Sequence, residues 1–498
     1  MNVLPRTVPA FPAAAGGVLL GVLAAGLAGV ALADRGVVGL LVVAVLTALV
    51  AATLADRAAP LYVALALGLT ALPAVLTSPV RIGPLSVLPF EPFLYLGAAL
   101  LAISARPRLP WALWALAGVV GLGTVVGVVV GNPIGILVSE LRPTVDLLVG
   151  AWVACAVVRT PTARRLLMTA AVILWTSLPL TMLGSLGLIR LGGREESAVT
   201  GGDATSGEAV RLLTPAVTLA FVAVIAAVAL VVTGRVALTR VLPWLLPAVP
   251  IVVLAFTRGH ILGFVASAVF VLVVLRRWAI VLVAVRTGTV LLVAALGAGL
   301  AVLLSPAGRW FGLQLDGFRR RVLDGLGAAG TTDPSVLYRE QETTNVVPRI
   351  LSSPVVGHGF GAAYQRPRSG LGSFFAEQAP YYLHDYYLWL ALKVGLLGLA
   401  VYLVLLVVPL VRVLRAGPAA PPAAVAAGAV VAAWLVVQVT TPVGLGFASA
   451  TVAGALYATA WCLAPAAQAK EVSPEAAQAG DRTVRADRTR ASASSSAR

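Results

Sequence analysis

His384 is the residue whose type and position most suggest chemistry. It is one of three histidines in the chain, and it stands beside Asp385 where the polar, aromatic start of segment 381–399 gives way to an apolar helix. A neutral imidazole at that point can accept a proton from a hydroxyl group. Asp385 and Lys393 add charge at the end of an apolar span, where burial is costly and usually serves a function. Asp385 either orients the imidazole or caps the incoming helix.

A purely structural role for His384 is the alternative. The residues around it form an aromatic belt of the kind that fixes helices at a membrane surface, and a histidine can hydrogen-bond there without taking part in a reaction. The aromatic residues of this belt are Tyr381, Tyr382, Tyr386, Tyr387 and Trp389.

Three arginines next to apolar runs suggest a binding site for an anion. Arg211 precedes one run, Arg258 lies in a very short turn between two runs, and Arg142 stands in a similar position. Arginine at a membrane surface suits a phosphate or diphosphate, because its planar fork binds two oxygens at once and stays charged. Anchoring at the interface is the alternative for each arginine. His260, close to Arg258, is interpreted as a turn residue.

Residues 306–384 form a long polar stretch, and loops of this length without a function are uncommon. Residues 338–351 are predicted to form an amphipathic helix that Pro354 ends. The polar residues of this helix include Arg339, Glu340 and Glu342. Alternate glycines then allow a tight turn, at Gly357, Gly359 and Gly361. Their spacing is not a dinucleotide-binding fingerprint, because no strand precedes it. His358, between two of these glycines, is interpreted as structural.

The elements that must position these residues are membrane-spanning helices. Of the 498 residues, 59% are hydrophobic and only 11% are charged, whereas soluble domains carry about 25% charged residues. Apolar runs of helical length are predicted at 12–32, 36–54, 59–77, 88–104, 109–131, 144–158, 165–189, 212–234, 241–257, 261–275, 287–305, 385–411, 421–440 and 445–464. We therefore predict an all-α, polytopic integral membrane bundle of about 12–14 transmembrane helices.

The distribution of arginine between the short loops predicts that both termini lie in the cytoplasm. The predicted organisation is a cytoplasmic N-terminus at 1–11, a transmembrane region at 12–305, a long extracytoplasmic loop at 306–384, C-terminal transmembrane helices at 385–464 and a disordered cytoplasmic tail at 465–498. The net charge of +16 does not indicate nucleic acid, because the arginines are scattered among apolar runs. Cys155 and Cys462 fall in apolar spans and no metal-ligand spacing exists, so neither a disulfide nor a metal is expected.

The residues around His384 resemble the O-antigen ligase and O-antigen polymerase superfamily of bacterial envelope enzymes. Ligases of that family have a His followed by Asn, Ser or Gln, nine further residues and then Gly-x-x-Gly. Here His384 and Asp385 are followed by nine residues and the run Gly395–Gly398. The spacing fits, and Asp385 departs from the family pattern, which leaves the ligase subtype open.

Two further features carry this resemblance, which covers roughly residues 200–410. The family has an Arg-Gly pair in a short outer turn, found here as Arg258 and Gly259. It also has a long outer loop whose Arg-Glu helix precedes a glycine-rich turn, found here from Arg339 to Gly361.

The resemblance implies a glycosyltransferase of the bacterial cytoplasmic membrane, with a GT-C-like fold and an extracytoplasmic active site. Such enzymes move a glycan from an undecaprenyl-diphosphate carrier to an acceptor hydroxyl on a glycan, lipid or protein, without a metal or other cofactor. His384 is then expected to be the general base of an inverting transfer. The residues expected to stabilise the leaving diphosphate are Arg211 and Arg258, with Arg142 or Arg339 in support. Lys393 and the three turn glycines are expected to support the site.

A transporter or flippase of envelope precursors is the main alternative, and a related peptidoglycan polymerase is another. Transporters place ionisable groups near the middle of the membrane, whereas most charges here cluster at loop ends. The sequence does not separate ligase from polymerase activity. The expected partners are the lipid-linked glycan donor, the acceptor and membrane lipid, with no nucleic acid.

Overall fold

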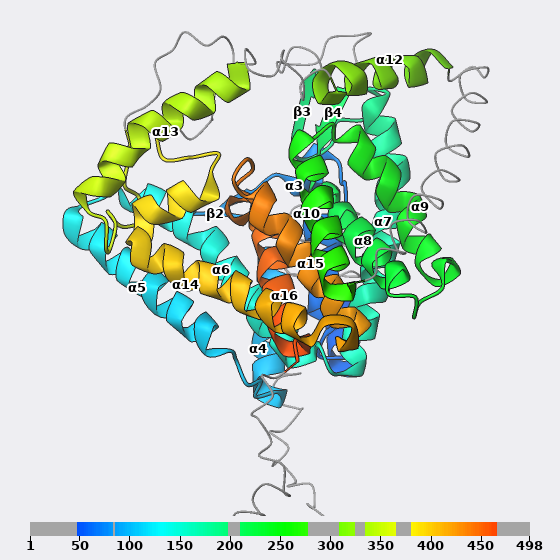
Figure 1. Cartoon of the computed structure of the whole chain (residues 1–498), viewed down its shortest axis with the longest axis horizontal. Helices are drawn as coiled ribbons and strands as arrows, with labels where there is room; N and C mark the ends of the chain where they lie inside the picture. The colour runs from blue at the N-terminus through cyan, green and yellow to red at the C-terminus, as the bar shows by residue number, and fades with distance from the viewer. Residues whose placement is uncertain are drawn as a thin grey trace, which may run out of the picture.

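The computed structural model describes residues 47–82, 85–197, 210–276, 308–323, 334–364 and 380–465. Most of these residues are helical, and the helices pack into one bundle (Figure 1). The helices are α2 (Ala59–Leu69), α3 (Ala74–Thr77), α4 (Glu91–Ser104), α5 (Trp111–Val130), α6 (Ile134–Val157), α7 (Pro161–Ser185), α8 (Pro215–Val232), α9 (Leu238–Leu254), α10 (Arg258–Leu275), α12 (Gly308–Phe318), α13 (Pro334–Ser352), α14 (Tyr386–Ala416), α15 (Pro422–Val437) and α16 (Phe447–Leu463).

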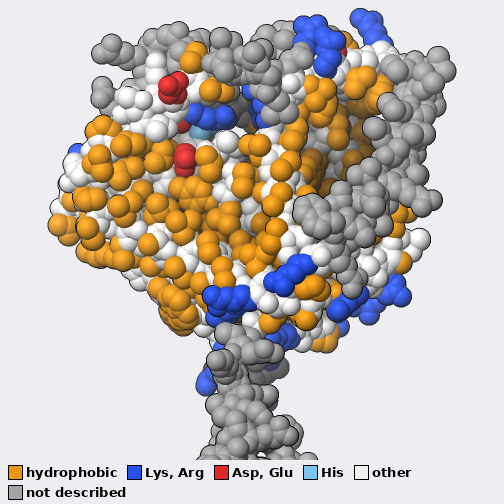
Figure 2. Space-filling view, in the orientation of Figure 1, with side chains coloured by type: hydrophobic (Ala, Val, Ile, Leu, Met, Phe, Trp, Pro, Cys, Tyr) orange, Lys and Arg blue, Asp and Glu red, His pale blue; other side chains and the backbone are white. Residues whose placement is uncertain are grey.

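Five of the described helices, α5, α7, α8, α10 and α14, are long and apolar enough to cross a membrane. Five shorter apolar helices, α2, α4, α9, α15 and α16, accompany them. A broad hydrophobic band covers the visible face of the molecule, with Lys and Arg side chains above and below it (Figure 2). Such a surface suits contact with lipid. The helices suit a bilayer as well, because a helix satisfies its own backbone hydrogen bonds there. The prediction of an all-α polytopic membrane protein is confirmed.

Predicted runs and observed helices agree over most of the described chain. Helices α5, α8, α10 and α15 begin and end within a few residues of the runs predicted for them. The predicted runs at 12–32 and 287–305, together with most of 36–54, lie outside the described residues, as does the predicted tail beyond residue 465.

The predicted runs 59–77 and 144–158 fold differently from the prediction. The run 59–77 is divided into α2 and the short helix α3, because Pro73 has no N–H to continue a helix and instead pairs with Leu191 in an isolated β-bridge. Helix α6 begins at Ile134, well before the run predicted at 144–158. Charged residues interrupt the apolar pattern there, and the folded protein gives them partners that the sequence pattern does not reveal.

Two short antiparallel hairpins connect helices in segments where the sequence predicted no strand. Strand β1 (Val80–Ile82) pairs with β2 (Leu85–Val87), and β3 (Arg194–Ser197) pairs with β4 (Val210–Leu213). Strand β4 leads directly into α8. The hairpin β3–β4 lies with α12 and α13 at the top of the molecule in Figure 1, which we call the upper end.

Helices α6 and α16 approach each other closely because small residues face one another. A Cβ on Gly150 would overlap the carbonyl oxygen of Thr451, and a Cβ on Gly454 would overlap that of Leu147. Close approach through small residues is the usual basis of helix packing in membranes. It fixes α6, which carries several of the charged residues described below.

Candidate functional site

His384 is held against a carboxylate from another part of the chain. Its Nδ1 lies 3.0 Å from Oε2 and 3.1 Å from Oε1 of Glu342 on α13, and its backbone N–H donates to Oε2 at 3.3 Å. His384 is 8% exposed and Glu342 is 3% exposed. A carboxylate at Nδ1 fixes the ring orientation and favours the tautomer with a proton on Nδ1, which makes Nε2 the basic nitrogen.

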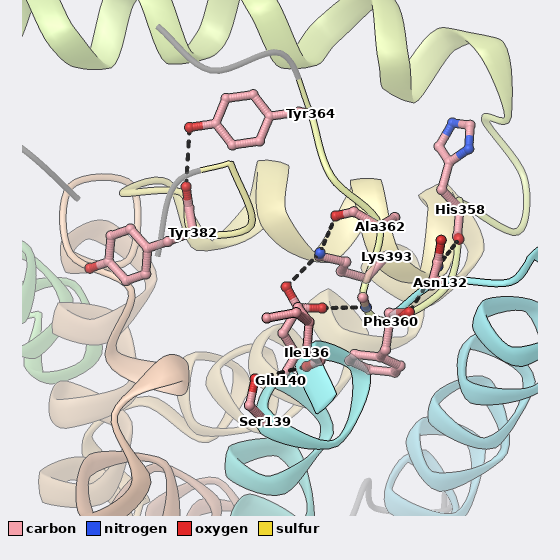
Figure 3. A network of polar contacts seen from close by, with 11 residues as sticks. Asn132, Ile136, Ser139, Glu140, His358, Phe360, Ala362, Tyr364, Tyr382 and Lys393 are labelled. Atoms are coloured by element: carbon pink, nitrogen blue, oxygen red, sulfur yellow. Dashed lines mark hydrogen bonds and ion pairs between the residues drawn. The ribbon is translucent and has the colours of Figure 1, made fainter. Parts of the chain in front are cut away.

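Aromatic side chains enclose this pair. The rings of Tyr338 and Tyr382 meet the imidazole of His384 edge-on, with centroids 5.9 and 5.2 Å away. The hydroxyl of Tyr364 lies 3.3 Å from Oε1 of Glu342. It also lies 3.2 Å from the carbonyl oxygen of Tyr382 (Figure 3). The imidazole is thus fixed by packing as well as by its carboxylate partner.

Glu342 contacts the imidazole of His384, whereas Asp385 caps a helix. Its Oδ1 accepts hydrogen bonds from the backbone N–H groups of Tyr387 at 2.8 Å and Leu388 at 3.1 Å, which makes it the N-cap of α14. The sequence left two roles open for Asp385, and this geometry favours the cap. The carboxylate that orients the imidazole is Glu342.

Helix α14 is broken at Gly395, whose φ of 70° and ψ of −177° are accessible essentially only to glycine. A break in a helix leaves backbone groups without intrahelical partners, and such groups are costly in a membrane. The loop after α13 supplies the partners. The N–H of Leu396 donates to the carbonyl of Pro354 at 2.7 Å, and the N–H of Leu397 donates to that of Val355 at 3.2 Å.

The glycine turn satisfies the other side of the break. The N–H groups of His358 and Gly359 donate to the carbonyls of Leu392 and Lys393, at 2.8 and 2.9 Å. All three turn glycines have positive φ, with 70° at Gly357, 79° at Gly359 and 81° at Gly361. A Cβ on Gly359 would overlap the backbone of Gly127 on α5. Glycine is therefore required where the turn passes between α5 and α14.

Lys393 lies beneath this turn at the centre of a buried polar network (Figure 3). Its Nζ is 2.6 Å from Oε1 of Glu140 and 2.6 Å from the carbonyl oxygen of Ala362. Oε2 of Glu140 accepts from the N–H of Gly361 at 2.5 Å, and Asn132 donates to two carbonyls of the turn at 2.9 Å. Lys393 is fully buried, and its two contacts connect α14 to α6 and to the glycine turn.

These contacts connect the two halves of the His384 pair. Helix α13 carries Glu342 and continues into the turn, and the turn is bound to α14, which begins two residues after His384. The break at Gly395 therefore fixes α13 against α14. The first glycine of the run Gly395–Gly398 is thus the point at which α14 breaks.

Replacing Gly395 with alanine is expected to destabilise the protein strongly. The new Cβ would overlap the carbonyl of Val355, and the backbone conformation alone costs about 1–3 kcal/mol for other residues. Thermal unfolding in detergent measures the effect. The matched control is Gly118→Ala on α5, where nothing lies within 4 Å of the added Cβ, and it should be neutral or stabilise by about 0.5–1 kcal/mol. A parental Tm for Gly395→Ala would contradict this account of the break.

A second group of side chains surrounds the turn between α9 and α10. Arg211 on β4 donates from Nε to the carbonyl of Ala255 at 3.1 Å and from Nη2 to Oγ1 of Thr257 at 3.4 Å. Thr257 is the N-cap of α10, and Arg258 is its first residue. The guanidinium group of Arg211 thus lies next to the N-terminal, positive end of α10, and Arg258 is the first residue of that helix. This arrangement favours a bound anion.

Phe256 in this turn is buried, and His260, in the first turn of α10, is half-buried. Phe256 is 1% exposed and has a φ of 44°, a left-handed conformation that costs a residue with a side chain roughly 1–2 kcal/mol. The ring of His260 stacks on Phe221 with centroids 4.5 Å apart. This contact favours the interpretation of His260 as a structural turn residue.

The turn between α9 and α10, which we call the arginine turn, lies near His384 because this turn and the start of α14 both contact the segment that follows α15. A Cβ on Gly259 would lie 3.0 Å from Oγ1 of Thr440. The carbonyl of Gln438 accepts from the N–H of Tyr386 at 3.0 Å. Segment 438–440 therefore contacts both the residue after Arg258 and the start of α14, and it places the two groups of side chains at the same end of the bundle.

Arg142 and Arg339 lie in different surroundings from that turn. Arg142 on α6 forms a two-pronged ion pair with Glu91, with Nε 2.6 Å from Oε1, and also contacts the carbonyl of Ser86. Glu91 is buried, so this fork already holds a carboxylate, which favours a structural role for Arg142.

Arg339 lies one turn before Glu342 on α13 and is half-buried beside the His384 pair.

Glu342 is the residue whose role the sequence analysis did not identify. It was predicted only as a polar residue of an amphipathic helix, and the pattern gave no sign that it is buried. The available signal was its spacing of four residues from Tyr338, which places both side chains on one helix face. That face is the one that meets His384.

Residues 243–403 match a family model described as O-Antigen ligase. The matched range contains the arginine turn at Arg258, the loop helix with Glu342, the glycine turn, His384 and the break at Gly395. Arg142 and Arg211 lie before it. No curated protein matches the chain.

Proposed function

We propose that this protein is a metal-independent glycosyltransferase of the O-antigen ligase and polymerase type, because residues 243–403 match the O-Antigen ligase family model. It takes a glycan from an undecaprenyl-diphosphate carrier and joins it to an acceptor hydroxyl at the extracytoplasmic face of the membrane. The observation that carries the proposal is the buried contact between Nδ1 of His384 and the carboxylate of Glu342. A carboxylate-oriented imidazole is the usual form of a general base.

The proton passes to His384 in this reaction. The acceptor oxygen attacks the anomeric carbon from the face opposite the diphosphate, a new carbon–oxygen bond forms, and the bond to the diphosphate oxygen breaks with inversion. The acceptor proton moves to Nε2 of His384. The resulting imidazolium is stabilised by Glu342 through Nδ1–H, so the carboxylate contributes more in the transition state than in the resting enzyme.

The leaving diphosphate receives the electrons of the broken bond, and positive charge is needed at that point. Arg258 is the principal candidate, because it starts α10 at the turn and adds its guanidinium to the helix N-terminus. Arg211 holds the same turn through Ala255 and Thr257 and adds a second positive charge. The polyprenyl tail of the carrier would remain in the lipid beside these helices.

The transporter alternative has one feature in its favour, the buried pair of Lys393 and Glu140. Ionisable groups inside a membrane often serve transport. Here both partners also bind the glycine turn, through Gly361 and Ala362, so the pair fixes a loop of the candidate site. This favours the enzyme.

The experiment that tests the proposal uses purified protein in proteoliposomes with a fluorescent undecaprenyl-diphosphate glycan, with and without EDTA. Each donor molecule also offers glycan hydroxyls as acceptors. We expect longer or transferred glycan and released undecaprenyl diphosphate, unchanged by EDTA. Movement of intact donor across the bilayer without any glycan transfer would support a flippase and contradict the proposal.

Replacing Glu342 with glutamine is expected to lower kcat at least about tenfold with little change in the donor KM. The amide keeps the shape of the side chain and loses the charge that stabilises the imidazolium. Glu340→Gln, on the exposed face of the same helix, is the matched control and should keep the parental kcat. Equal kcat values for Glu342→Gln and the parent would remove Glu342 from the mechanism.

A further inference from the structure

The turn that leads into Arg258 contains an unusual backbone conformation. Phe256 has a φ of 44°, and Arg276 is the other described non-glycine residue with positive φ. Arg276 is the C-cap of α10, near the helix end where left-handed residues are common. Phe256 instead lies between two helices, is bulky and is almost fully buried. Such conformations persist only where the surroundings enforce them, and they cluster at functional sites.

Two of the side chains that pack against Phe256 come from α12 and the turn that follows it, at the upper end of the molecule. Phe256 packs with Val322, Phe318 and Ile261 in a cluster separate from the main core. Phe318 ends α12, and its ring centroid is 6.2 Å from that of Phe256. Val322 is 1% exposed and lies in the π-helical turn Arg319–Leu323. Turns of this kind are rare and are frequent at functional sites.

Arg211 binds both neighbours of Phe256. The carbonyl of Ala255 and the hydroxyl of Thr257 both accept from its guanidinium, and the Thr257 hydroxyl also donates to that carbonyl at 3.0 Å. A change of φ at Phe256 would rotate the peptide groups that link these residues. It would therefore move Thr257, the N-cap of α10, and redirect Arg258.

We propose that α12 and the π-helical turn form a clasp that holds Phe256 in its left-handed conformation and thereby aims Arg258 at the donor diphosphate. Phe256, Phe318 and Val322 are positioning residues, since the argument has them act through Arg258. This inference rests on the proposed function and names a segment of the long loop, away from the His384 pair, as a determinant of donor binding.

The test replaces the two side chains of the clasp that pack against Phe256 and leaves the α9–α10 turn itself unchanged. Phe318→Ala and Val322→Ser are expected to raise the donor KM by about ten- to a hundredfold, the range expected when a catalytic group is displaced by about 1 Å. Because Arg258 also stabilises the leaving diphosphate, kcat should fall as well. Leu315→Ala, on the exposed side of α12 at 53% exposure, is the matched control and should keep the parental KM.

A rescue experiment separates positioning from general stability. Glycine adopts positive φ without strain, so adding Phe256→Gly to Val322→Ser is expected to recover part of the donor KM while removing still more packing. A merely structural role predicts the opposite, a further loss. Parental KM values in both clasp variants, or no recovery in the double variant, would overturn the inference.

A second measurement does not depend on turnover. Inorganic pyrophosphate should raise the Tm of the parent in detergent by binding the folded state, and this shift should be lost in Val322→Ser and retained in Leu315→Ala. An equal shift in Val322→Ser and the parent would overturn the clasp while leaving the proposed function intact. A parent with neither transfer activity nor a pyrophosphate shift would overturn both.

Discussion

His384→Ala is expected to lower the rate of glycan transfer by about 10²–10⁴-fold, the usual contribution of a general base. The variant loses the only group that the proposal assigns to the acceptor proton, while the binding of donor through the arginine turn is untouched. Initial rates in proteoliposomes with the fluorescent donor measure kcat and KM separately. The loss should appear in kcat.

His358→Ala is the matched control for this variant. Its imidazole contacts the carbonyl of Arg349 at 2.7 Å and Oγ of Ser352 at 3.2 Å, at the end of α13 and away from Glu342. Losing these contacts should cost about 0.5–1.5 kcal/mol of stability at most for each hydrogen bond and leave transfer intact. Parental rates for His384→Ala, with normal insertion in the membrane, would remove the base from the mechanism.

Arg258→Lys is expected to be nearly as damaging as Arg258→Ala, with each lowering transfer by about 10²–10³-fold. Lysine keeps the charge but loses the planar fork that binds two oxygens of a diphosphate. Because the diphosphate is bound before and during the reaction, both kcat and the donor KM should change. Competition by inorganic pyrophosphate provides an independent measure of the loss of binding.

Arg415→Lys is the matched control for the arginine variants, because Arg415 is exposed in the last turn of α14, at the opposite end of that helix from His384. It should behave as the parent. If Arg258→Lys transferred glycan as fast as the parent with an unchanged donor KM, a positive charge would suffice at this position. That result would contradict the proposal that the Arg258 guanidinium binds two oxygens of the diphosphate.

Apolar periodicity was enough to predict the membrane bundle and most of its helices, because a span needs a long run of apolar residues wherever it packs. Apolar periodicity predicted helix bounds less well where charged residues are buried. Helix α6 extends through Glu140 and Arg142 because Lys393 and Glu91 neutralise them, and both partners lie far away in the sequence. Periodicity is a local property and carries no information on such pairs.

The candidate site could be predicted in part. His384 was identified from its place at a helix entrance, and the turn glycines from their spacing. The break at Gly395 could not be foreseen from its own helix, since the groups that satisfy it belong to Pro354 and Val355. The role of Glu342 depends on the same long-range contact, because only the docking of α13 brings its carboxylate to the imidazole.

The most direct test of the central claim is a cryo-EM structure of the protein in lipid nanodiscs with undecaprenyl diphosphate bound. The account predicts the diphosphate at the upper end, within hydrogen-bonding distance of the Arg258 guanidinium, in a space that also opens onto Nε2 of His384. A diphosphate bound away from the α9–α10 turn, or a wall of protein between it and His384, would contradict it.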